Sequence, residues 1–350
     1  MISSSKESAP LRVALVGTGR WGQGVLGKLL GFSRVEVVAI ADKVHANLSG
    51  MLPNEGGKNL AYFQGEHLLR EEIQAGRMQV DAVVICGPCH LQAAWAADYL
   101  RLGVSVFVEK PGATSELDLE RLAQAQHDAA TDPVFAVGHL LHFHPIYRCV
   151  KDCIAAGTIG QLRAIVSRRW GCRERDSISP LWILAPHDLS MAIAFLGEAQ
   201  QLSSCEQANQ RSWAEFQTSE ETRFRIDISP TGPAERFSFY WGERGVIYVD
   251  ELTNRVVEVT EPIALEQLLT IFKEDEPLTK LREAIQGLNG RELKVEAGDA
   301  LEEELQAFVV AALAQRTGIQ LQLPNDLEDL AKVTVALLTW EDALRGVGKN

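Results

Sequence analysis

The sequence predicts an α/β protein with two domains, an N-terminal doubly wound parallel sheet and a C-terminal α+β domain with an open antiparallel sheet. Three observations support this prediction. Apolar strands alternate with helices over residues 11–138, a glycine-rich turn follows the first strand, and a period-two alternation begins after residue 202. A chain of 350 residues is also longer than one hydrophobic core usually serves.

The N-terminal part follows a repeated strand and helix pattern. Short apolar stretches predict buried strands over residues 11–16, 35–41, 81–85, 104–108 and 134–138. Apolar residues at helical spacing predict helices over residues 24–31, 91–102 and 116–130. Strands that alternate with helices form parallel sheets covered on both faces, and right-handed crossovers make such a sheet doubly wound.

The pattern changes from residue 146. Helices are expected over residues 146–156 and 184–196, with a strand over residues 161–169 between them. Alternating residues in 222–228 and 246–249 then predict antiparallel strands. We therefore expect a disordered lead over residues 1–10, a first domain over 11–145 and a second over 146–350. The amphipathic final helices, about 300–316 and 326–345, cap the second domain or return to the first.

Composition excludes some classes of partner. The net charge is −13, from 47 acidic and 34 basic residues, which disfavours binding to nucleic acid or to an anionic membrane surface. No apolar run approaches the length of a membrane span, and the first ten residues lack the apolar stretch of a secretory signal. The cysteines show no disulfide framework, which indicates a reducing cytoplasm: Cys86, Cys89, Cys149, Cys153, Cys172 and Cys205. An open sheet needs cover, so we expect a homodimer or homotetramer through the C-terminal sheet.

The turn after the first strand is Gly17-Thr18-Gly19-Arg20-Trp21-Gly22, the pattern that binds a dinucleotide pyrophosphate at a helix start. Gly17 permits the tight bend, Gly19 lets the backbone approach the phosphates, and Gly22 lets helix and strand pack closely. Asp42 ends the second strand about 20 positions later, where an acidic residue binds the adenosine ribose. The sequence therefore predicts a dinucleotide site.

The choice between NAD and NADP depends on Asp42. Its carboxylate would accept hydrogen bonds from both ribose hydroxyls and would repel a 2′-phosphate, which favours NAD over NADP. The nearby cations Arg20 and Lys43 would soften that repulsion.

Beyond this turn, the chain resembles the glucose-fructose oxidoreductase, inositol dehydrogenase and rhizopine-catabolism (Gfo/Idh/MocA) family. The motifs occur in the family's order: the glycine turn, Ala41-Asp42, Glu109-Lys110-Pro111, Gly138-His139 before Phe143 and Pro145, and Pro186-His187-Asp188. The stretch over residues 181–190 is most similar to bacterial UDP-N-acetyl-hexosamine and hexosaminuronate 3-dehydrogenases. The resemblance implies an NAD-binding Rossmann domain over residues 11–145 and a substrate and oligomerisation domain over 146–350.

The resemblance also implies hydride transfer between NAD and a secondary hydroxyl of a sugar or sugar nucleotide, such as C3 of a UDP-amino sugar or uronate. Lys110 and His187 would face the substrate, and either could be the base that takes the hydroxyl proton. Lys110 would also contact the nicotinamide ribose. The cofactor would be lined further by Gly87, Pro88, Glu109 and His139, in addition to the residues of the glycine turn.

Arginines are concentrated before His187, at Arg163, Arg168, Arg169, Arg173 and Arg175. Their planar donors suit a diphosphate or carboxylate, and Arg169 is the predicted substrate contact. A solvated strand and loop, partly neutralised by Glu174 and Asp176, is the alternative explanation.

Several positions depart from the family pattern. Ile183 replaces an aspartate, Gly87 a threonine, Gln92 a histidine and His142 an arginine. These departures keep a non-catalytic dinucleotide-binding regulator open, and the fold also serves reductases of other substrates, such as inositols, dihydrodiols and bile pigments.

Two further motifs, a pair of cysteines and a group of histidines, are expected to have no redox or metal-binding role. Cys86-Gly87-Pro88-Cys89 matches a redox dithiol motif, but we expect it to line the nicotinamide pocket, with a gating disulfide as the alternative. The histidines at 139, 142 and 144 have no interleaved carboxylate, and the family is ordinarily metal-free, so we expect no metal.

Overall fold

The structure is a computed structural model that describes residues 9–44, 47, 60–171, 178–199, 201–208, 210–218, 222–272, 277–287 and 290–347. Residues 1–8 of the predicted lead, Cys172, Arg173 and Arg175 lie outside the described residues. No helix in the described ranges combines the length and the apolar character needed to span a membrane.

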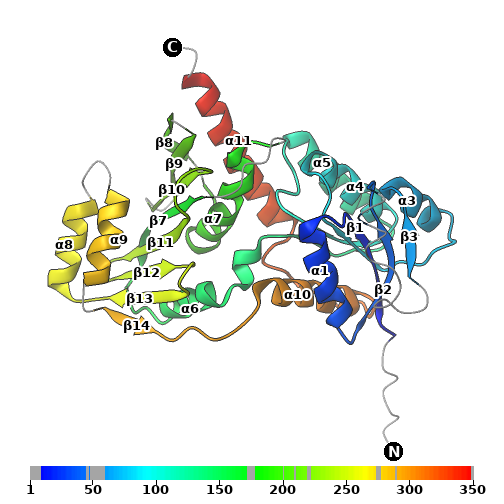
Figure 1. Ribbon diagram of the computed structural model, residues 1–350, viewed down its shortest axis with the longest axis horizontal. Helices are drawn as coiled ribbons and strands as arrows, with labels where there is room; N and C mark the ends of the chain where they lie inside the picture. The colour runs from blue at the N-terminus through cyan, green and yellow to red at the C-terminus, as the bar shows by residue number, and fades with distance from the viewer. Residues whose placement is uncertain are drawn as a thin grey trace, which may run out of the picture. The chain divides into compact units, whose positions relative to one another are not determined.

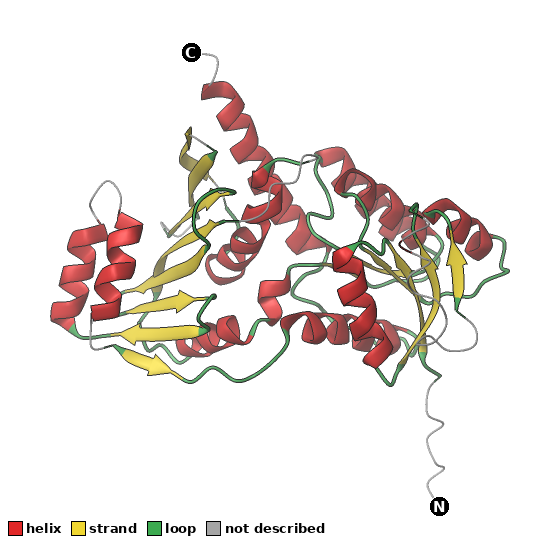
Figure 2. Ribbon diagram, in the orientation of Figure 1, coloured by secondary structure: helices red, strands yellow, loops and turns green. Residues whose placement is uncertain are grey.

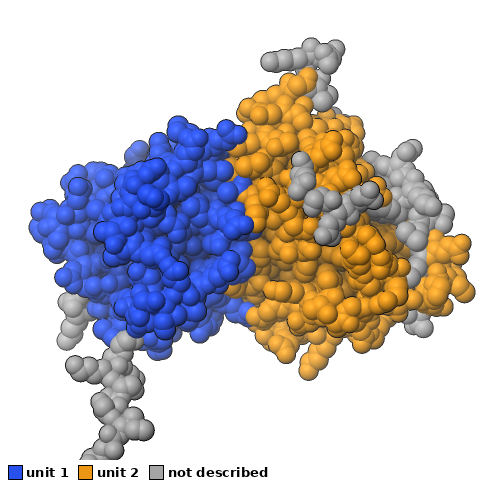
Figure 3. All heavy atoms as spheres, turned by 180° about the vertical axis from the view of Figure 1, so that it is seen from behind, with its two compact units in different colours: residues 1–139, 301–331 blue, residues 140–300, 332–350 orange. Residues whose placement is uncertain are grey.

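The chain divides into two compact units, which Figure 3 shows in separate colours. Unit 1 comprises Met1–His139 and Leu301–Ala331, and unit 2 comprises Leu140–Ala300 and Lys332–Asn350. Residues 140–145, predicted for the first domain, belong to unit 2. Residues 301–331 belong to unit 1, which is one of the two placements expected for the final helices.

Unit 1 is built on a parallel sheet with the strand order β3-β2-β1-β4-β5-β6 (Figure 1). Its strands are β1 Leu11–Val16, β2 Val35–Ala41, β3 Ala61–Phe63, β4 Ala82–Ile85, β5 Ser105–Val108 and β6 Phe135–Val137. Every pair of neighbours is parallel. The order reverses between β1 and β4, which is the topological switch point where such sheets bind ligands. The predicted doubly wound sheet is confirmed.

Helices cover both faces of this sheet: α1 Arg20–Gly31, α3 Glu66–Gln74, α4 Cys89–Arg101, α5 Glu116–Asp128 and α10 Ala300–Gln315 (Figure 2). One hydrophobic core contains Leu69 of α3, Leu100 of α4 and Leu122 of α5. The opposite core joins Leu29 of α1 to Phe308 of α10. Thus α10, which is distant in sequence, packs on the sheet of unit 1.

Unit 2 contains an eight-stranded sheet with the order β14-β13-β12-β11-β7-β10-β9-β8. Its strands are β7 Leu162–Trp170, β8 Gln201–Ala208, β9 Arg211–Gln217, β10 Arg223–Ser229, β11 Glu235–Gly242, β12 Val246–Asp250, β13 Arg255–Val259 and β14 Arg291–Leu293. The pairing is antiparallel except between β7 and β10, which run parallel. The second domain is therefore α+β as predicted, on a mixed sheet.

The helical segments of unit 2 are η1 Leu140–Phe143, α6 Pro145–Ala155, α7 Pro180–Leu196, α8 Pro262–Phe272, α9 Pro277–Gly287 and most of α11 Leu327–Val347. The core beneath α7 contains Phe216, Phe224 and Trp340. On the other side, Leu268 of α8 and Leu281 of α9 pack against Phe239 and neighbouring strand residues. The chain itself therefore covers part of the face that the sequence predicts to be open.

Candidate active site

In the glycine turn, Gly17 and Gly22 are required by the packing of the chain, whereas the backbone of Gly19 has open space beside it. Gly17 has φ +90°, and a Cβ there would lie 2.7 Å from the carbonyl oxygen of Cys86. A Cβ on Gly22 would lie 2.0 Å from the carbonyl oxygen of Gly17, so only glycine lets α1 start this close to β1. A Cβ on Gly19 would have no described neighbour within 4 Å. Gly19 therefore offers open backbone at the helix start, which fits the pyrophosphate of a dinucleotide.

Asp42 is held at the end of β2 by the same turn. Its Oδ2 accepts hydrogen bonds from Thr18 N at 2.7 Å and Thr18 Oγ1 at 2.9 Å, and its Oδ1 accepts from Val44 N at 2.7 Å. Burial alone would raise the pKa of Asp42, but these bonds and one from Asn47 outweigh burial and lower that pKa. The carboxylate is thus ionised at neutral pH, and it fits the acceptor that an adenosine ribose requires.

We expect Gly19→Ala to fold normally and to lose affinity for NADH. The added methyl meets nothing within the described chain, but it fills the space in which a pyrophosphate would approach the backbone. Urea unfolding should match the wild type, whereas NADH fluorescence titration should show a dissociation constant raised by about tenfold or more. Unchanged NADH affinity would contradict a pyrophosphate site at this turn.

Lys110 follows β5 at the carboxyl edge of the parallel sheet, where it is partly buried. The preceding Glu109 is buried, and its Oε1 accepts a hydrogen bond from the indole Nε1 of Trp21 in the glycine turn. A Cβ on Gly138 would lie 3.0 Å from Glu109 Oε2 and 3.3 Å from Lys110 N. The glycine turn, the Lys110 segment and the end of β6 therefore meet at one edge of unit 1.

Gly87 and Pro88 lie at the start of α4, where Pro88 is the N-cap. A Cβ on Gly87 would lie 2.3 Å from the ring of Trp95. The glycine in place of the family's threonine is therefore matched by the packing of Trp95.

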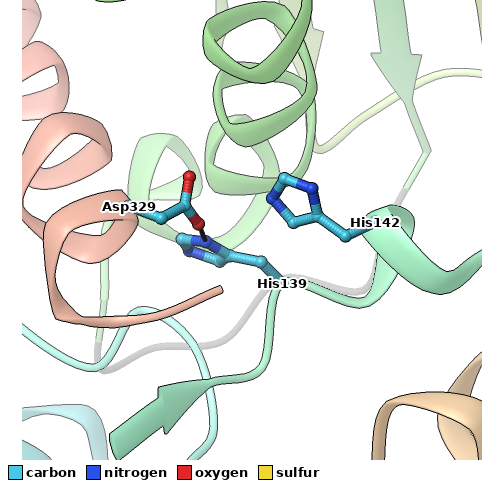
Figure 4. A group of neighbouring side chains, drawn as sticks. All are labelled: His139, His142 and Asp329. Atoms are coloured by element: carbon cyan, nitrogen blue, oxygen red, sulfur yellow. Dashed lines mark hydrogen bonds and ion pairs between the residues drawn. The ribbon is translucent and has the colours of Figure 1, made fainter. Parts of the chain in front are cut away.

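His139 is fully buried and contacts an aspartate from the C-terminal segment of unit 1. Its Nδ1 lies 2.5 Å from Oδ2 of Asp329, in the first turn of α11, and Figure 4 shows this pair with a dashed line. His142, three residues further along the chain, is drawn in the same view. The carboxylate fixes the orientation of the imidazole ring. No local sequence pattern points to Asp329, because the two paired residues are 190 positions apart.

Glu304 is a second residue that the sequence did not single out. It lies on α10 with 1% exposure and accepts a hydrogen bond from Asn325 Nδ2 at 3.2 Å. Burial, and after it the negative charge of Glu109, raise the pKa of Glu304 well above its ordinary value. Burial beside a second acidic group therefore favours the protonated form of Glu304.

We expect Glu304→Gln to stabilise the protein increasingly as the pH rises. Because the folded pKa of Glu304 lies above the unfolded one, the unfolded state releases this proton first, and stability is lost as the pH rises between the two values. The wild type should lose about 1.4 kcal/mol per pH unit in that window, and a neutral glutamine removes this loss. Urea unfolding from about pH 5 to about pH 8 measures it.

The control for this prediction is Glu71→Gln, which changes an exposed glutamate of α3. Its stability should follow the wild type at every pH. A difference between Glu304→Gln and the wild type that stays constant with pH would contradict the protonated state of Glu304.

His187 lies within α7 in unit 2 and is partly buried. Its carbonyl oxygen accepts a hydrogen bond from Ser190 Oγ at 3.0 Å. Ile183, one turn earlier, is partly buried and packs against the hydrophobic core. The position at which the family often has an aspartate is therefore apolar here.

Arg169, the predicted substrate contact, is paired with carboxylates of its own domain. Its Nε lies 2.5 Å from Asp188 Oδ2, and its two terminal nitrogens lie 2.6 and 3.1 Å from the carboxylate of Glu251. Tyr147 also donates to Glu251, at 2.7 Å. With 4% exposure, Arg169 neutralises two buried carboxylates of its own domain, and its contact with a substrate stays a prediction. Through Asp188, it holds the helix turn that carries His187.

Cys86 and Cys89 are free thiols. Burial, and then the charge of Glu109, raise the pKa of Cys86 well above its ordinary value. A thiolate is therefore disfavoured at Cys86.

Comparison with known proteins shows that residues 11–139 match the family GFO_IDH_MocA, described as an oxidoreductase family with an NAD-binding Rossmann fold. A 4-carboxy-2-hydroxymuconate-6-semialdehyde dehydrogenase from Sphingobium is 30% identical over 43% of this chain and 44% of its own length. Inositol 2-dehydrogenase 1 from Saccharopolyspora erythraea is 29% identical over 43% of each chain. The rhizopine catabolism protein MocA from Rhizobium meliloti is 26% identical over 45% of this chain and 47% of its own length. These matches span less than half of each relative.

Solved structures with the same fold extend over nearly the whole chain. A UDP-N-acetylglucosamine 3-dehydrogenase from Acidithiobacillus ferrooxidans has a TM-score of 0.73, covers 96% of this chain and 98% of its own, and is 18% identical. A 3-ketoreductase from Actinomadura kijaniata, solved with NADP and TDP-benzene, has a TM-score of 0.73 at 19% identity over 96% and 97% of the two chains. At this identity the likeness establishes the fold. Residues 11–139 are thus similar to the NAD-binding Rossmann domain of this oxidoreductase family, and the glycine turn and Asp42 lie within the matched range.

Proposed function

We propose that the protein is an NAD-dependent oxidoreductase that transfers a hydride between the cofactor and a secondary hydroxyl of a sugar or sugar nucleotide. The observation that carries this proposal is that three features lie at one edge of the parallel sheet of unit 1. Gly19 offers open backbone after β1, the ionised Asp42 follows β2, and Lys110 follows β5. This is the edge that binds ligands in open α/β sheets.

The choice of NAD over NADP is part of this proposal. Asp42 is ionised and would repel the 2′-phosphate of NADP, and its Oδ1 accepts one described bond, which leaves capacity for a ribose hydroxyl. Arg20 and Lys43 lie beside it in sequence and would reduce the discrimination. Parallel titrations with NADH and NADPH measure the preference, which we expect to favour NADH.

The chemistry divides between the cofactor and two side chains. A bound nicotinamide would accept the hydride that leaves the carbinol carbon. Lys110 would hold the reacting hydroxyl or take its proton, because an amine that is partly desolvated can be neutral near physiological pH. His187 is the alternative base. Glu109, Gly87, Pro88 and His139 would line the cofactor, and His139 would be oriented by Asp329.

A sugar-type substrate is supported by relatives named for inositol oxidation and rhizopine catabolism. The stretch over residues 181–190 and the fold shared with a UDP-N-acetylglucosamine 3-dehydrogenase favour C3 of a UDP-amino sugar or uronate. The arginines give less support for an anionic sugar nucleotide than the sequence suggested. Arg163 is paired with Glu243, Arg168 with Asp227 and Arg169 with Asp188. We accordingly retain free polyols such as inositol as candidate substrates.

The test is turnover with NAD on a panel of UDP-N-acetyl-hexosamines, UDP-hexosaminuronates and free polyols, followed by the absorbance of NADH. We expect one class to be oxidised. Tight binding of NADH without turnover on any member would favour the alternative function, a dinucleotide-binding regulator. That alternative is motivated by the apolar Ile183 at the position where the family often has an aspartate.

We further propose a cytoplasmic location and a homodimer or homotetramer through the C-terminal sheet. The free cysteines among the described residues suit a reducing compartment. Since α8 and α9 cover the strands near β12, we place the self-association surface on the outer face of β8, β9 and β10, of which β8 is largely exposed. Light scattering of the purified chain would give the number of subunits.

A further inference from the structure

Gln92 joins two loops that leave the carboxyl ends of neighbouring strands. It lies in the first turn of α4, and its Nε2 donates to the carbonyl oxygen of Gly87 at 3.2 Å. Its Oε1 accepts from the backbone N of Gly112 at 3.0 Å. The side chain is 3% exposed. One amide thus bridges the loop after β4 to the segment that carries Lys110.

Both hydrogen bonds depend on the amide group. The carbonyl of Gly87 needs a donor, and the N–H of Gly112 needs an acceptor, and a glutamine supplies one of each. Gly112 has φ +74° and is packed closely, because a Cβ there would lie 3.1 Å from Val137 and 3.2 Å from Leu330. The segment is therefore held on one side by apolar packing and on the other by Gln92.

We propose that Gln92 is a positioning residue that fixes the Lys110 segment against the Gly87 loop. This role rests on the proposed function, in which Lys110 meets the substrate and Gly87 lines the nicotinamide. Gln92 acts through the backbone of Gly112, two residues beyond Lys110, and does not itself contact the reacting atoms. The replacement of the family's histidine by Gln92 is therefore no sign of lost catalysis, because the amide supplies the bridge.

The test compares Gln92→Glu with Gln92→Met. A protonated glutamate can donate to Gly87 and accept from Gly112, whereas an ionised one only accepts and would face the carbonyl oxygen of Gly87. Methionine has a similar length and makes neither bond. We expect the kcat of Gln92→Glu, divided by that of the wild type at each pH, to fall about tenfold as the pH rises and to recover at low pH. The ratio for Gln92→Met should be low at every pH.

The matched control is Gln74→Glu, at an exposed position at the end of α3, where the ratio should stay near one at every pH. A ratio for Gln92→Glu that does not change with pH would overturn the positioning role. Urea unfolding of each variant separates this effect from a loss of folded protein.

A second measurement does not depend on the proposed function. Hydrogen exchange in the apoprotein should be about tenfold faster at residues 109–113 in Gln92→Met than in the wild type. If the wild type turns over no substrate but this exchange accelerates, the bridge stands and the proposed function fails. If exchange at residues 109–113 is the same in both proteins, the bridge itself is refuted.

Discussion

Replacing Lys110 by alanine should lower kcat by about 10²-fold to 10⁴-fold, the range that a positioned acid or base contributes. Lys110 is partly buried and directly follows β5. Gly138 packs closely against it, because a Cβ on Gly138 would lie 3.3 Å from the backbone N of Lys110. Its side chain is proposed to hold or deprotonate the hydroxyl, so its loss should act on the chemical step. The dissociation constant for NADH should change much less than kcat.

Two variants make this prediction specific. Lys151→Ala removes an exposed lysine of α6 in unit 2 and should leave kcat unchanged. His187→Asn tests the other candidate base, and the larger loss of kcat, together with loss of the acidic limb of the pH profile, identifies the base. Turnover by Lys110→Ala at the wild-type rate would remove Lys110 from the catalytic site.

Replacing Arg169 by methionine should cost about 3 to 5 kcal/mol of folding free energy. The change keeps an unbranched side chain with an apolar stem but leaves the carboxylates of Asp188 and Glu251 buried without their counterion. Removing one partner of a buried ion pair is costly, because the remaining charge has neither water nor a partner. Urea unfolding should show the loss as a lower midpoint.

The control is Arg163→Met on the same strand, where an exposed arginine pairs with an exposed glutamate and the cost should be about 0 to 1 kcal/mol. Adding Asp188→Asn and Glu251→Gln to Arg169→Met should restore part of the stability. Equal stability of the Arg169 and Arg163 variants would contradict the buried network. A loss of substrate affinity without a loss of stability would instead support the substrate contact predicted from sequence.

The parts of the site that could be predicted from sequence are local. The glycine turn combines strand end, tight bend and helix start within a few residues, and each glycine has a physical reason that the structure reproduces at Gly17 and Gly22. Asp42 is also local, because it ends the strand paired with β1. Alternating strands and helices indicated the parallel sheet by the same kind of short-range pattern.

The parts that could not be predicted depend on contacts between distant residues. Asp329 contacts His139, which lies 190 positions earlier in the chain. Glu304 lies close enough to Glu109 for the two acidic groups to interact only because α10 packs on the sheet of unit 1. Strand alternation predicts that one of two adjacent arginines in β7 is exposed, yet Arg168 and Arg169 are both buried, each against carboxylates. No local pattern shows where a counterion will be.

The proposed reaction moves a hydride between a sugar carbon and a nicotinamide bound at the glycine turn. Its most direct test is label transfer from the substrate that turns over in the panel, prepared with deuterium on the carbinol carbon and incubated with NAD. Mass spectrometry of the recovered cofactor should find the deuterium in NADH, and Gly19→Ala should yield less of it at the same NAD concentration. NADH that forms without deuterium, or no labelled cofactor from any member of the panel, would contradict hydride transfer by this protein.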